Sequence, residues 1–256
     1  MCTLTVIPKD DGYLLAMNRD EQLTRGEARP PVRFDLGPTS ALYPRDVLGG
    51  TWIASSSHGI SLALLNRNEI ALTSAAPQEK GRSRGELSPA LIQRTSYSDI
   101  HDALTAFDRR GILPFRLVGI LPEERTISEW TWDNVRLTSR SQHWSPRHWF
   151  SSSLSDARAT TERGAVCSEA WQEADAGTRL WLRRLHASHS NGPGPFSLCV
   201  HRELVATVSF TEVVCNRNEV RMEYFAKGPC AMEQCGHAIF LEREAVAGLT
   251  PLISMR

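Results

Sequence analysis

Long apolar runs are missing from this chain. No stretch of its 256 residues approaches the roughly 18 apolar residues that a membrane-spanning helix needs. The N-terminus also lacks the basic segment and the apolar segment of a signal peptide. The sequence therefore predicts no membrane span, and we expect a cytoplasmic protein.

An excess of one charge and a dense cysteine pattern are also missing. Lys and Arg together number 29, as do Asp and Glu, and a net charge of zero argues against a nucleic-acid partner. Six cysteines are too few for a disulfide scaffold, so reduced thiols are expected. Cys230, Cys235 and His237 have a spacing that zinc tolerates, but Cys199 or Cys215 would have to complete the set. The expectation is therefore free thiols and no metal.

Strands and helices are predicted in separate blocks. Apolar patterns predict strands at residues 3–7, 13–17, 51–55, 60–65, 70–74, 115–121, 128–132, 135–139, 149–153, 196–201, 206–215 and 220–225. Amphipathic patterns predict helices at residues 86–95, 99–108, 156–176 and 179–187. The proline-rich residues 28–46 are predicted to form an ordered loop. Such blocks favour a layered α+β fold, and no linker divides residues 1–256, which predicts a single domain.

The cysteine at position 2 is the most informative residue. Removal of Met1 is expected before so small a side chain. Cys2 would then carry an α-amine and a thiol, with ordinary pKa values of about 8 and about 8.5, on one residue. Such an amine can act as the base for its own side chain, so no distant histidine is needed.

An Asn-Arg-Asp-Glu run at residues 18–21 follows the second predicted strand. If the first two strands form a hairpin, this run lies beside Cys2. Arg19 would then favour the thiolate, and Asp20 would orient Arg19 or the α-ammonium. An Arg–Asp pair that only closes the hairpin is the alternative. Successive strand residues point to opposite faces, so both side chains reach Cys2 only if the strand has ended.

Three further motifs have a structural and a functional interpretation. Asn66, at the end of a predicted strand, is either a turn residue or a donor to an oxyanion. Gly50 and Trp52, in a Gly-Gly-Thr-Trp run, offer close backbone approach and a flat apolar wall, in a pocket or in the core. The Gly-Arg-Ser-Arg-Gly run at residues 81–85 is either an anion-binding loop before a helix or a surface connection.

Together these motifs resemble the NRDE family, also called the transport and Golgi organisation protein 2 family. The resemblance rests, in order, on Met-Cys-Thr-Leu at residues 1–4, Asn-Arg-Asp-Glu at 18–21, Gly-Gly-Thr-Trp at 49–52 and Leu-Asn-Arg at 65–67. It covers most of the chain. That family is similar to the N-terminal nucleophile hydrolases, so the resemblance implies their four-layer αββα sandwich.

The resemblance also implies roles for single residues. In the cysteine members that cleave amides, such as bile salt hydrolases and penicillin V acylases, Cys2 matches the nucleophile. Arg19 and Asp20 match an arginine and an aspartate near it, and Asn66 matches the asparagine of the oxyanion hole. These four are the predicted catalytic residues. The predicted substrate-binding residues are Asn18, Gly50, Trp52, Ser152 and Ser153.

Two departures from those acylases are visible in the sequence. A further asparagine of the acylases is replaced here by the serine run at residues 151–153. A serine hydroxyl donates one hydrogen bond, with a different reach from an amide. For a late active-site arginine, Arg202 is the candidate that the sequence offers.

The resemblance implies a hydrolase that cleaves a linear amide or related acyl bond through a Cys2 thioester, without a cofactor. The alternative is a non-catalytic carrier or chaperone of haem, lipid or acyl-coenzyme A in the same pocket, since family members have been linked to haem trafficking and to lipid or acyl-coenzyme A metabolism. A structural or regulatory protein that keeps the fold is a third reading. The sequence contains no Cys-Pro or Cys-x-x-Cys-His haem motif. The expected partner is a small amide, acyl or amphipathic molecule, and the oligomeric state is left open.

Overall fold

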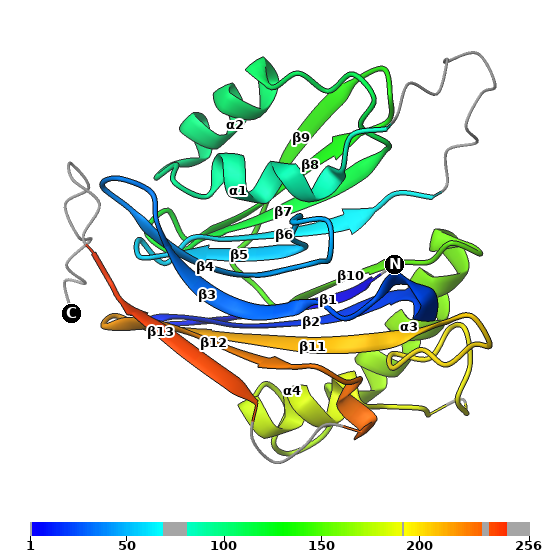
Figure 1. The fold of residues 1–256 in the computed structure, drawn as a ribbon. Helices are drawn as coiled ribbons and strands as arrows, with labels where there is room; N and C mark the ends of the chain where they lie inside the picture. Colours follow the sequence, from blue (N-terminus) through cyan, green and yellow to red (C-terminus); the bar gives the residue numbers. More distant parts are fainter. Residues whose placement is uncertain (1, 69–80, 191, 232–235, 245–256) are drawn as a thin grey trace.

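The computed structural model describes residues 2–68, 81–190, 192–231 and 236–244. Two antiparallel sheets are stacked face to face, and helices cover the outer face of each sheet (Figure 1). The described part of the chain is therefore a four-layer αββα sandwich, as predicted.

The first sheet contains the N-terminal strand at its interior. Its order is β10 (Arg147–Ser151), β1 (Cys2–Lys9), β2 (Gly12–Gln22), β11 (Val205–Cys215), β12 (Glu219–Phe225) and β13 (His237–Glu242). Two helices, α3 (Asp156–Ala170) and α4 (Arg179–His186), pack on its outer face. A 3₁₀ turn, η1 (Leu23–Arg25), follows β2, and another, η3 (Pro229–Ala231), follows β12.

The second sheet has the order β3 (Arg29–Asp35), β4 (Ser40–Arg45), β5 (Ile53–Ser56), β6 (Ser61–Asn66), β7 (Phe115–Leu121), β8 (Thr126–Trp132) and β9 (Leu137–Gln142). The 3₁₀ turn η2 (Arg84–Glu86) leads into α1 (Leu87–Leu91), and α2 (Tyr97–Ala106) follows. Apolar side chains of α1 and α2 pack on the outer face of this sheet. None of the helices in the described ranges has the length and apolarity to cross a membrane.

Strand alternation divides β1 and β2 between the two faces of the first sheet. Leu4 and Met17 belong to the core between the sheets, whereas Ala16 packs in the core under α3 and α4. Successive residues of a strand point to opposite faces. The same period directs Arg19 to the inner face.

Residues 28–46 were predicted to be a loop, and this prediction is wrong, because β3 and β4 occupy them. β3 is an edge strand of the second sheet, and its pairing with β4 shifts between Arg29 and Val32. An edge strand with such an irregularity tolerates Pro30 and Pro31, since the missing N–H groups need no partner there. The proline content of these residues therefore led to the prediction of a loop where two paired strands are found.

The strand predicted at residues 196–201 is also wrong, because this segment consists of turns and bends with one isolated bridge. β11 already pairs with β2 and β12, so it offers no free edge. Side chains instead form hydrogen bonds with backbone groups of this segment. The Leu198 carbonyl accepts from Asn18 Nδ2 at 2.8 Å, and the Val200 N–H donates to Thr207 Oγ1 at 2.8 Å.

The remaining predictions differ mainly in length. The predicted helix at 156–176 ends at Ala170, the one predicted at 86–95 is reduced to η2 and α1, and β13 had not been predicted. The strand predicted at residues 70–74 lies outside the described residues.

Candidate active site

Cys2 begins β1 and has a neighbour on each side. Its register partners are Arg19 on β2 and Ser151 on β10. Directly paired residues lie on the same face, so the Arg19 side chain lies beside the Cys2 thiol. The backbone nitrogen of Cys2 donates a hydrogen bond to Ser151 Oγ at 2.9 Å. The predicted nucleophile thus has a guanidinium beside its sulfur and a hydroxyl on its nitrogen.

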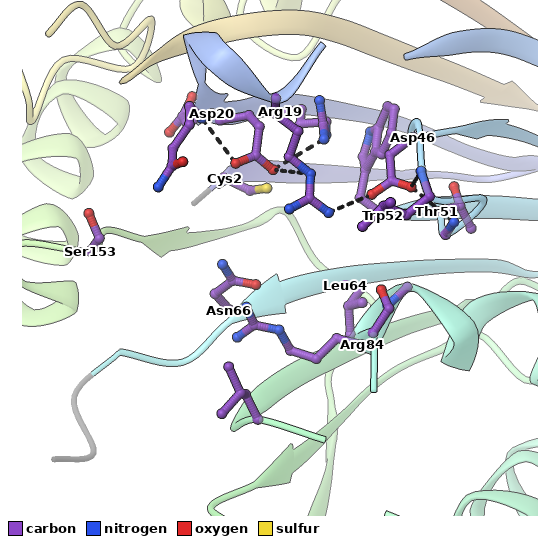
Figure 2. Close-up of a pocket in the computed structure, with 18 of the residues that line it drawn as sticks. Cys2, Arg19, Asp20, Asp46, Thr51, Trp52, Leu64, Asn66, Arg84 and Ser153 are labelled. Carbon is purple, nitrogen blue, oxygen red and sulfur yellow. Dashed lines mark hydrogen bonds and ion pairs between the residues drawn. The ribbon is translucent and has the colours of Figure 1, made fainter. Parts of the chain in front are cut away.

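A cavity of about 470 Å³ opens at this end of the sandwich. Figure 2 shows Cys2 and Arg19 on one wall, with Asn66 and Arg84 facing them. The predicted site residues that line the cavity are Cys2, Arg19, Asp20, Gly50, Trp52, Asn66 and Ser153. Segments far apart in the sequence therefore meet at one cavity.

Arg19 is held between a carboxylate and an aromatic ring. Its Nη2 lies 3.1 Å from Glu21 Oε2, and its guanidinium carbon lies 4.5 Å from the centre of the Trp52 ring. Arg19 is only 5% exposed. The carboxylate in this ion pair is Glu21, whereas the sequence suggested Asp20. The positive charge is fixed in place next to Cys2.

Asp20 sits where strand alternation directs it, toward the helical layer. Its Oδ1 accepts from Thr207 Oγ1 at 2.6 Å, and its Oδ2 lies 3.7 Å from Arg163 Nη2. Burial raises the pKa of Asp20, and the charge of Arg163 opposes this effect. β2 continues to Gln22, so the strand has not ended at this point. Asp20 thereby supports the site from behind.

Arg163, on α3, contacts the site from behind and was not singled out from the sequence. It is wholly buried, and its Nη1 lies 2.9 Å from Thr3 Oγ1 and 3.5 Å from the carbonyl oxygen of Cys2. With Asp20 it fixes the first residues of β1. The available signal was its place four residues after Ala159 and four before Cys167, on the buried face of α3.

Opposing effects act on the pKa of the Cys2 thiol, and burial is the largest. Burial raises the pKa of the Cys2 thiol, and the Asp20 carboxylate adds to the rise. The Arg19 charge and the Asp20 backbone N–H, which faces the sulfur, lower it. Because burial dominates, the pKa of the thiol lies above its ordinary value.

Asn66 ends β6 on the wall opposite Cys2 (Figure 2). It is half-buried, and its side-chain amide has no hydrogen-bond partner among the described residues. An amide that faces a cavity with its N–H groups unused is able to donate to a negatively charged oxygen. This placement favours the oxyanion role over the turn role.

The loop at residues 81–86 forms another part of the wall because two glycines touch. A Cβ atom on Gly85 would lie 2.8 Å from the Cα of Gly50, and the Thr51 N–H donates to the Gly85 carbonyl at 3.1 Å. A capping box between Ser83 and Glu86 starts η2. Gly50 thus serves the site through its lack of a side chain.

Arg84 is carried into the cavity by this loop. Its Nη1 donates to the Pro114 carbonyl at 3.0 Å, and no carboxylate within the described ranges forms an ion pair with it. Burial lowers the pKa of Arg84, and the nearby Cys2 and Glu21 oppose this. By contrast, Arg82 pairs with Glu86 at 2.8 Å. The anion-binding interpretation of the loop is thus supported at Arg84.

Some predicted residues lie elsewhere. Asn18 does not line the cavity, because it points to the outer face, where its Nδ2 donates to the carbonyl of His186 at 2.9 Å. Ser152 is buried beneath the site and is absent from the cavity lining. Arg202 donates to Ser153 Oγ at 3.3 Å without lining the cavity itself.

The zinc set considered from the sequence does not assemble. His237 Nε2 donates to the Pro31 carbonyl at 3.1 Å, and Cys215 is buried in the core between the sheets. Cys235 lies outside the described residues. Cys199 and Cys230 do meet, with 3.4 Å between their sulfur atoms.

The fold is that of the N-terminal nucleophile hydrolases. An arginine-to-leucine variant of the conjugated bile acid hydrolase from Clostridium perfringens is similar with a TM-score of 0.54 and 10% identity, over 98% of each chain. A cysteine-to-alanine mutant of the same hydrolase gives a TM-score of 0.53 and 10% identity, over 94% of this chain and 92% of that one. Penicillin V acylase from Agrobacterium tumefaciens gives 0.47 and 11% identity, over 94% and 86%.

The family follows from the sequence itself. Residues 1–242 match the family described as Transport and Golgi organisation 2, and the chain belongs to it. No curated protein sequence matches the chain.

Proposed function

We propose that this protein is a cysteine N-terminal nucleophile amidohydrolase that cleaves a linear amide or related acyl bond through a Cys2 thioester. One observation carries the proposal: Cys2 lines the cavity with its nitrogen held by Ser151 and its side chain beside Arg19. A pure carrier has no need for this arrangement at residue 2. The five described cysteines are free, in keeping with a reducing cytoplasm.

The reaction would begin once Met1 is removed. The α-amine of Cys2, held by Ser151, takes the proton of the thiol, and the sulfur attacks the carbonyl carbon. The Asn66 amide donates to the resulting oxyanion. The C–N bond then breaks, the α-ammonium gives its proton to the leaving amine, and a thioester remains. Water then gives a proton to the α-amine as it attacks the thioester, and when the C–S bond breaks this proton passes to the Cys2 sulfur and the acid is released.

The cavity favours a substrate with an anionic group. Arg84 projects into it without a carboxylate partner in the described part of the chain, and guanidinium groups bind carboxylates and phosphates well. Three other arginines line the cavity and are already paired. Arg19 lies 3.1 Å from Glu21, Arg25 lies 2.9 Å from Asp46, and Arg82 lies 2.8 Å from Glu86. Arg84 is therefore the cation that we assign to the substrate.

A carrier of haem, lipid or acyl-coenzyme A is the second candidate. Exposed Leu48 and Leu113 line the cavity together with its arginines, which suits an amphipathic anion. Among the described residues that line it, Cys2 is the thiolate ligand that haem iron would use, and no histidine is present. Haem titration of the wild type and of Cys2→Ala tests this candidate.

The main experiment combines intact-mass measurement with a reactive acyl donor. The purified protein should have lost Met1, and p-nitrophenyl hexanoate should acylate it once, at Cys2. Cys2→Ala should gain no acyl group. Retention of Met1, or equal acylation of Cys2→Ala, would contradict the mechanism.

Substrate charge is tested with two linear amides of equal length, adipoyl p-nitroanilide and hexanoyl p-nitroanilide. The wild type should prefer the adipoyl amide, which has a free carboxylate. Arg84→Gln should lose this preference through KM, and Arg82→Gln, which removes a cation already paired with Glu86, is the matched control. Equal preference in the wild type and in Arg84→Gln would refute the assignment of Arg84 while leaving the Cys2 mechanism intact.

A further inference from the structure

Four soft side chains gather outside the cavity, where the segment between α4 and β11 meets η3. They are His189, Cys199, His201 and Cys230, and the possible ligand atoms of all four lie within 4.8 Å of one another. None of the four lines the cavity. The cluster therefore needs an explanation separate from that of the candidate active site.

The distances within the cluster match a tetrahedron around one ion. The sulfur atoms of Cys199 and Cys230 are 3.4 Å apart, and they lie 3.7 Å and 3.4 Å from Nε2 of His201. With Zn–S of about 2.3 Å and Zn–N of about 2.1 Å, a tetrahedral site has about 3.8 Å between two sulfur atoms and about 3.6 Å between a sulfur and a nitrogen, so each of these three distances lies within about 0.4 Å of it. Three of the four residues thus already have the spacing of zinc ligands.

His189 supplies an independent observation. Its Nε2 atom is buried and has no hydrogen-bond partner, and its ring centre lies 4.8 Å from that of His201. Buried polar atoms are rarely left without a partner. A metal ion bound in the cluster would satisfy this nitrogen.

We propose that His189, Cys199, His201 and Cys230 bind one zinc ion. Two thiolates and two imidazoles are a ligand set that zinc prefers, and four protein ligands close the coordination sphere, as in structural sites. Binding converts each Cys–SH to a Zn–S⁻ ligand and releases its proton, while both imidazoles bind as neutral rings. The ion would join η3 to the segment before β11.

This site lies directly behind the candidate active site. Val200, between two of the ligands, donates its N–H to Thr207 Oγ1 at 2.8 Å, and Thr207 in turn donates to Asp20 Oδ1 at 2.6 Å. Zinc would therefore fix the segment that holds Asp20. We assign it a structural role, since no ligand position is left open for a substrate.

A disulfide between Cys199 and Cys230 is the competing explanation. A disulfide bond is about 2.05 Å long, and the 3.4 Å between the two sulfur atoms is that of separate thiols. Its formation would need an oxidant, whereas zinc needs only the loss of protons. The two explanations predict different masses and different metal contents.

The experiment measures metal content by plasma mass spectrometry after purification under reducing conditions and supply of zinc. The wild type should retain one zinc per chain, and its cobalt form should show the absorption of a tetrahedral site with thiolate ligands. Cys230→Ser and His201→Ala should lose the metal. His143→Ala, which removes an exposed histidine elsewhere, and Cys2→Ala, which removes the cavity thiol, should retain it.

Three results would overturn the proposal. One is the absence of stoichiometric zinc from a wild type whose near-UV circular dichroism spectrum is that of a folded protein. This holds whether or not the intact mass shows a Cys199–Cys230 disulfide. Another is full zinc retention in both the Cys230→Ser variant and the His201→Ala variant. Cobalt absorption without thiolate bands would equally exclude the proposed ligands.

Discussion

The backbone nitrogen of Cys2 lies 2.9 Å from the hydroxyl oxygen of Ser151, across the β1–β10 pair. The two residues are separated by 149 positions, yet their contact is fixed by the register of two adjacent strands. The hydroxyl lies where it can orient a nitrogen that becomes an amine when Met1 is removed. In the proposed mechanism that amine is the base for the thiol.

Ser151→Ala should therefore slow acylation of Cys2 by p-nitrophenyl hexanoate by about tenfold or more, as expected when a general base is misplaced. It should also lower the free energy of unfolding by about 1–3 kcal/mol, because the buried nitrogen loses its partner. Ser152→Ala is the matched control, since Ser152 is equally buried but its hydroxyl accepts from the Leu154 N–H and not from the Cys2 nitrogen. Equal acylation rates in the two variants would show that Ser151 does not orient the base.

Asn66→Ala should lower kcat for adipoyl p-nitroanilide by about 10²–10³-fold, the usual loss for one oxyanion donor. KM should change little, because the oxyanion exists only after attack on the carbonyl. Asn68→Ala, two residues along the chain and hydrogen-bonded to Asp156 instead, should keep most of the activity. A loss that falls mainly on KM would make Asn66 a substrate-binding residue.

Much of the site could be predicted because it is local in sequence. The Lys-Asp-Asp-Gly turn predicts that β1 and β2 form a hairpin, and this pairing alone places Arg19 beside Cys2. Alternation along an unbroken strand then predicts that Asp20 faces the helices. The sequence interpretation counted Asp20 among the catalytic residues on the condition that the strand had ended, whereas β2 continues to Gln22.

The parts that could not be predicted depend on distant pairing. Ser151 reaches Cys2 because β10 pairs with β1, and no local pattern specifies that neighbour. Arg163 is a buried charge on a helix, compensated by Asp20 and by backbone oxygens from other elements. Asn18 is in the same Asn-Arg-Asp-Glu run as Arg19, but its side chain lies on the opposite face of the sheet. The sequence motif therefore predicted a cavity residue that does not line the cavity.

Gly85→Ala should destabilise the wall that carries Arg84. The added Cβ would lie 2.8 Å from the Cα of Gly50 and 2.9 Å from the nitrogen of Thr51, contacts that only a backbone shift relieves. Overpacking of this kind costs about 1–3 kcal/mol. Urea denaturation should show this loss, together with a weaker preference for the adipoyl amide.

Gly194→Ala is the matched control for that substitution, since a Cβ there meets nothing within 4 Å. Its stability should stay within about 0.5 kcal/mol of the wild type. If both glycine variants unfold at the same urea concentration, the close approach of Gly50 and Gly85 is not what holds the loop.

The buried His186 and the half-buried His148 form one hydrogen-bonded chain through Thr5. Trp171 Nε1 donates to His148 Nε2 at 3.0 Å, His148 Nδ1 lies 2.9 Å from Thr5 Oγ1, and Thr5 Oγ1 lies 2.9 Å from His186 Nε2. His186 Nδ1 lies 3.1 Å from Asn18 Oδ1. Asn18 Oδ1 only accepts and the indole only donates, so every group is satisfied in one direction when both imidazoles are neutral.

Acid should therefore weaken the fold in the pH range of histidine. Burial lowers the pKa of His148 to about 4, and burial, aided by His148, lowers that of His186 to about 3. An unfolded histidine has a pKa of about 6.5, so below that pH the unfolded chain binds protons that the folded chain refuses. The contribution of the two neutral histidines to the free energy of unfolding is fully present above pH of about 6.5. It falls toward pH 5 with a slope that approaches about 1.4 kcal/mol per pH unit for each histidine.

Urea denaturation between pH 7 and pH 5 measures this slope in a range above the ordinary titration of carboxylates. His148→Gln should reduce it by the share of one histidine, because that group no longer titrates. His143→Gln, at an exposed position, should leave the slope as in the wild type. A wild type whose stability is flat over this range would mean that both imidazoles take up protons inside the fold as they do in the unfolded chain, which would contradict the hydrogen-bonded chain from Trp171 to Asn18.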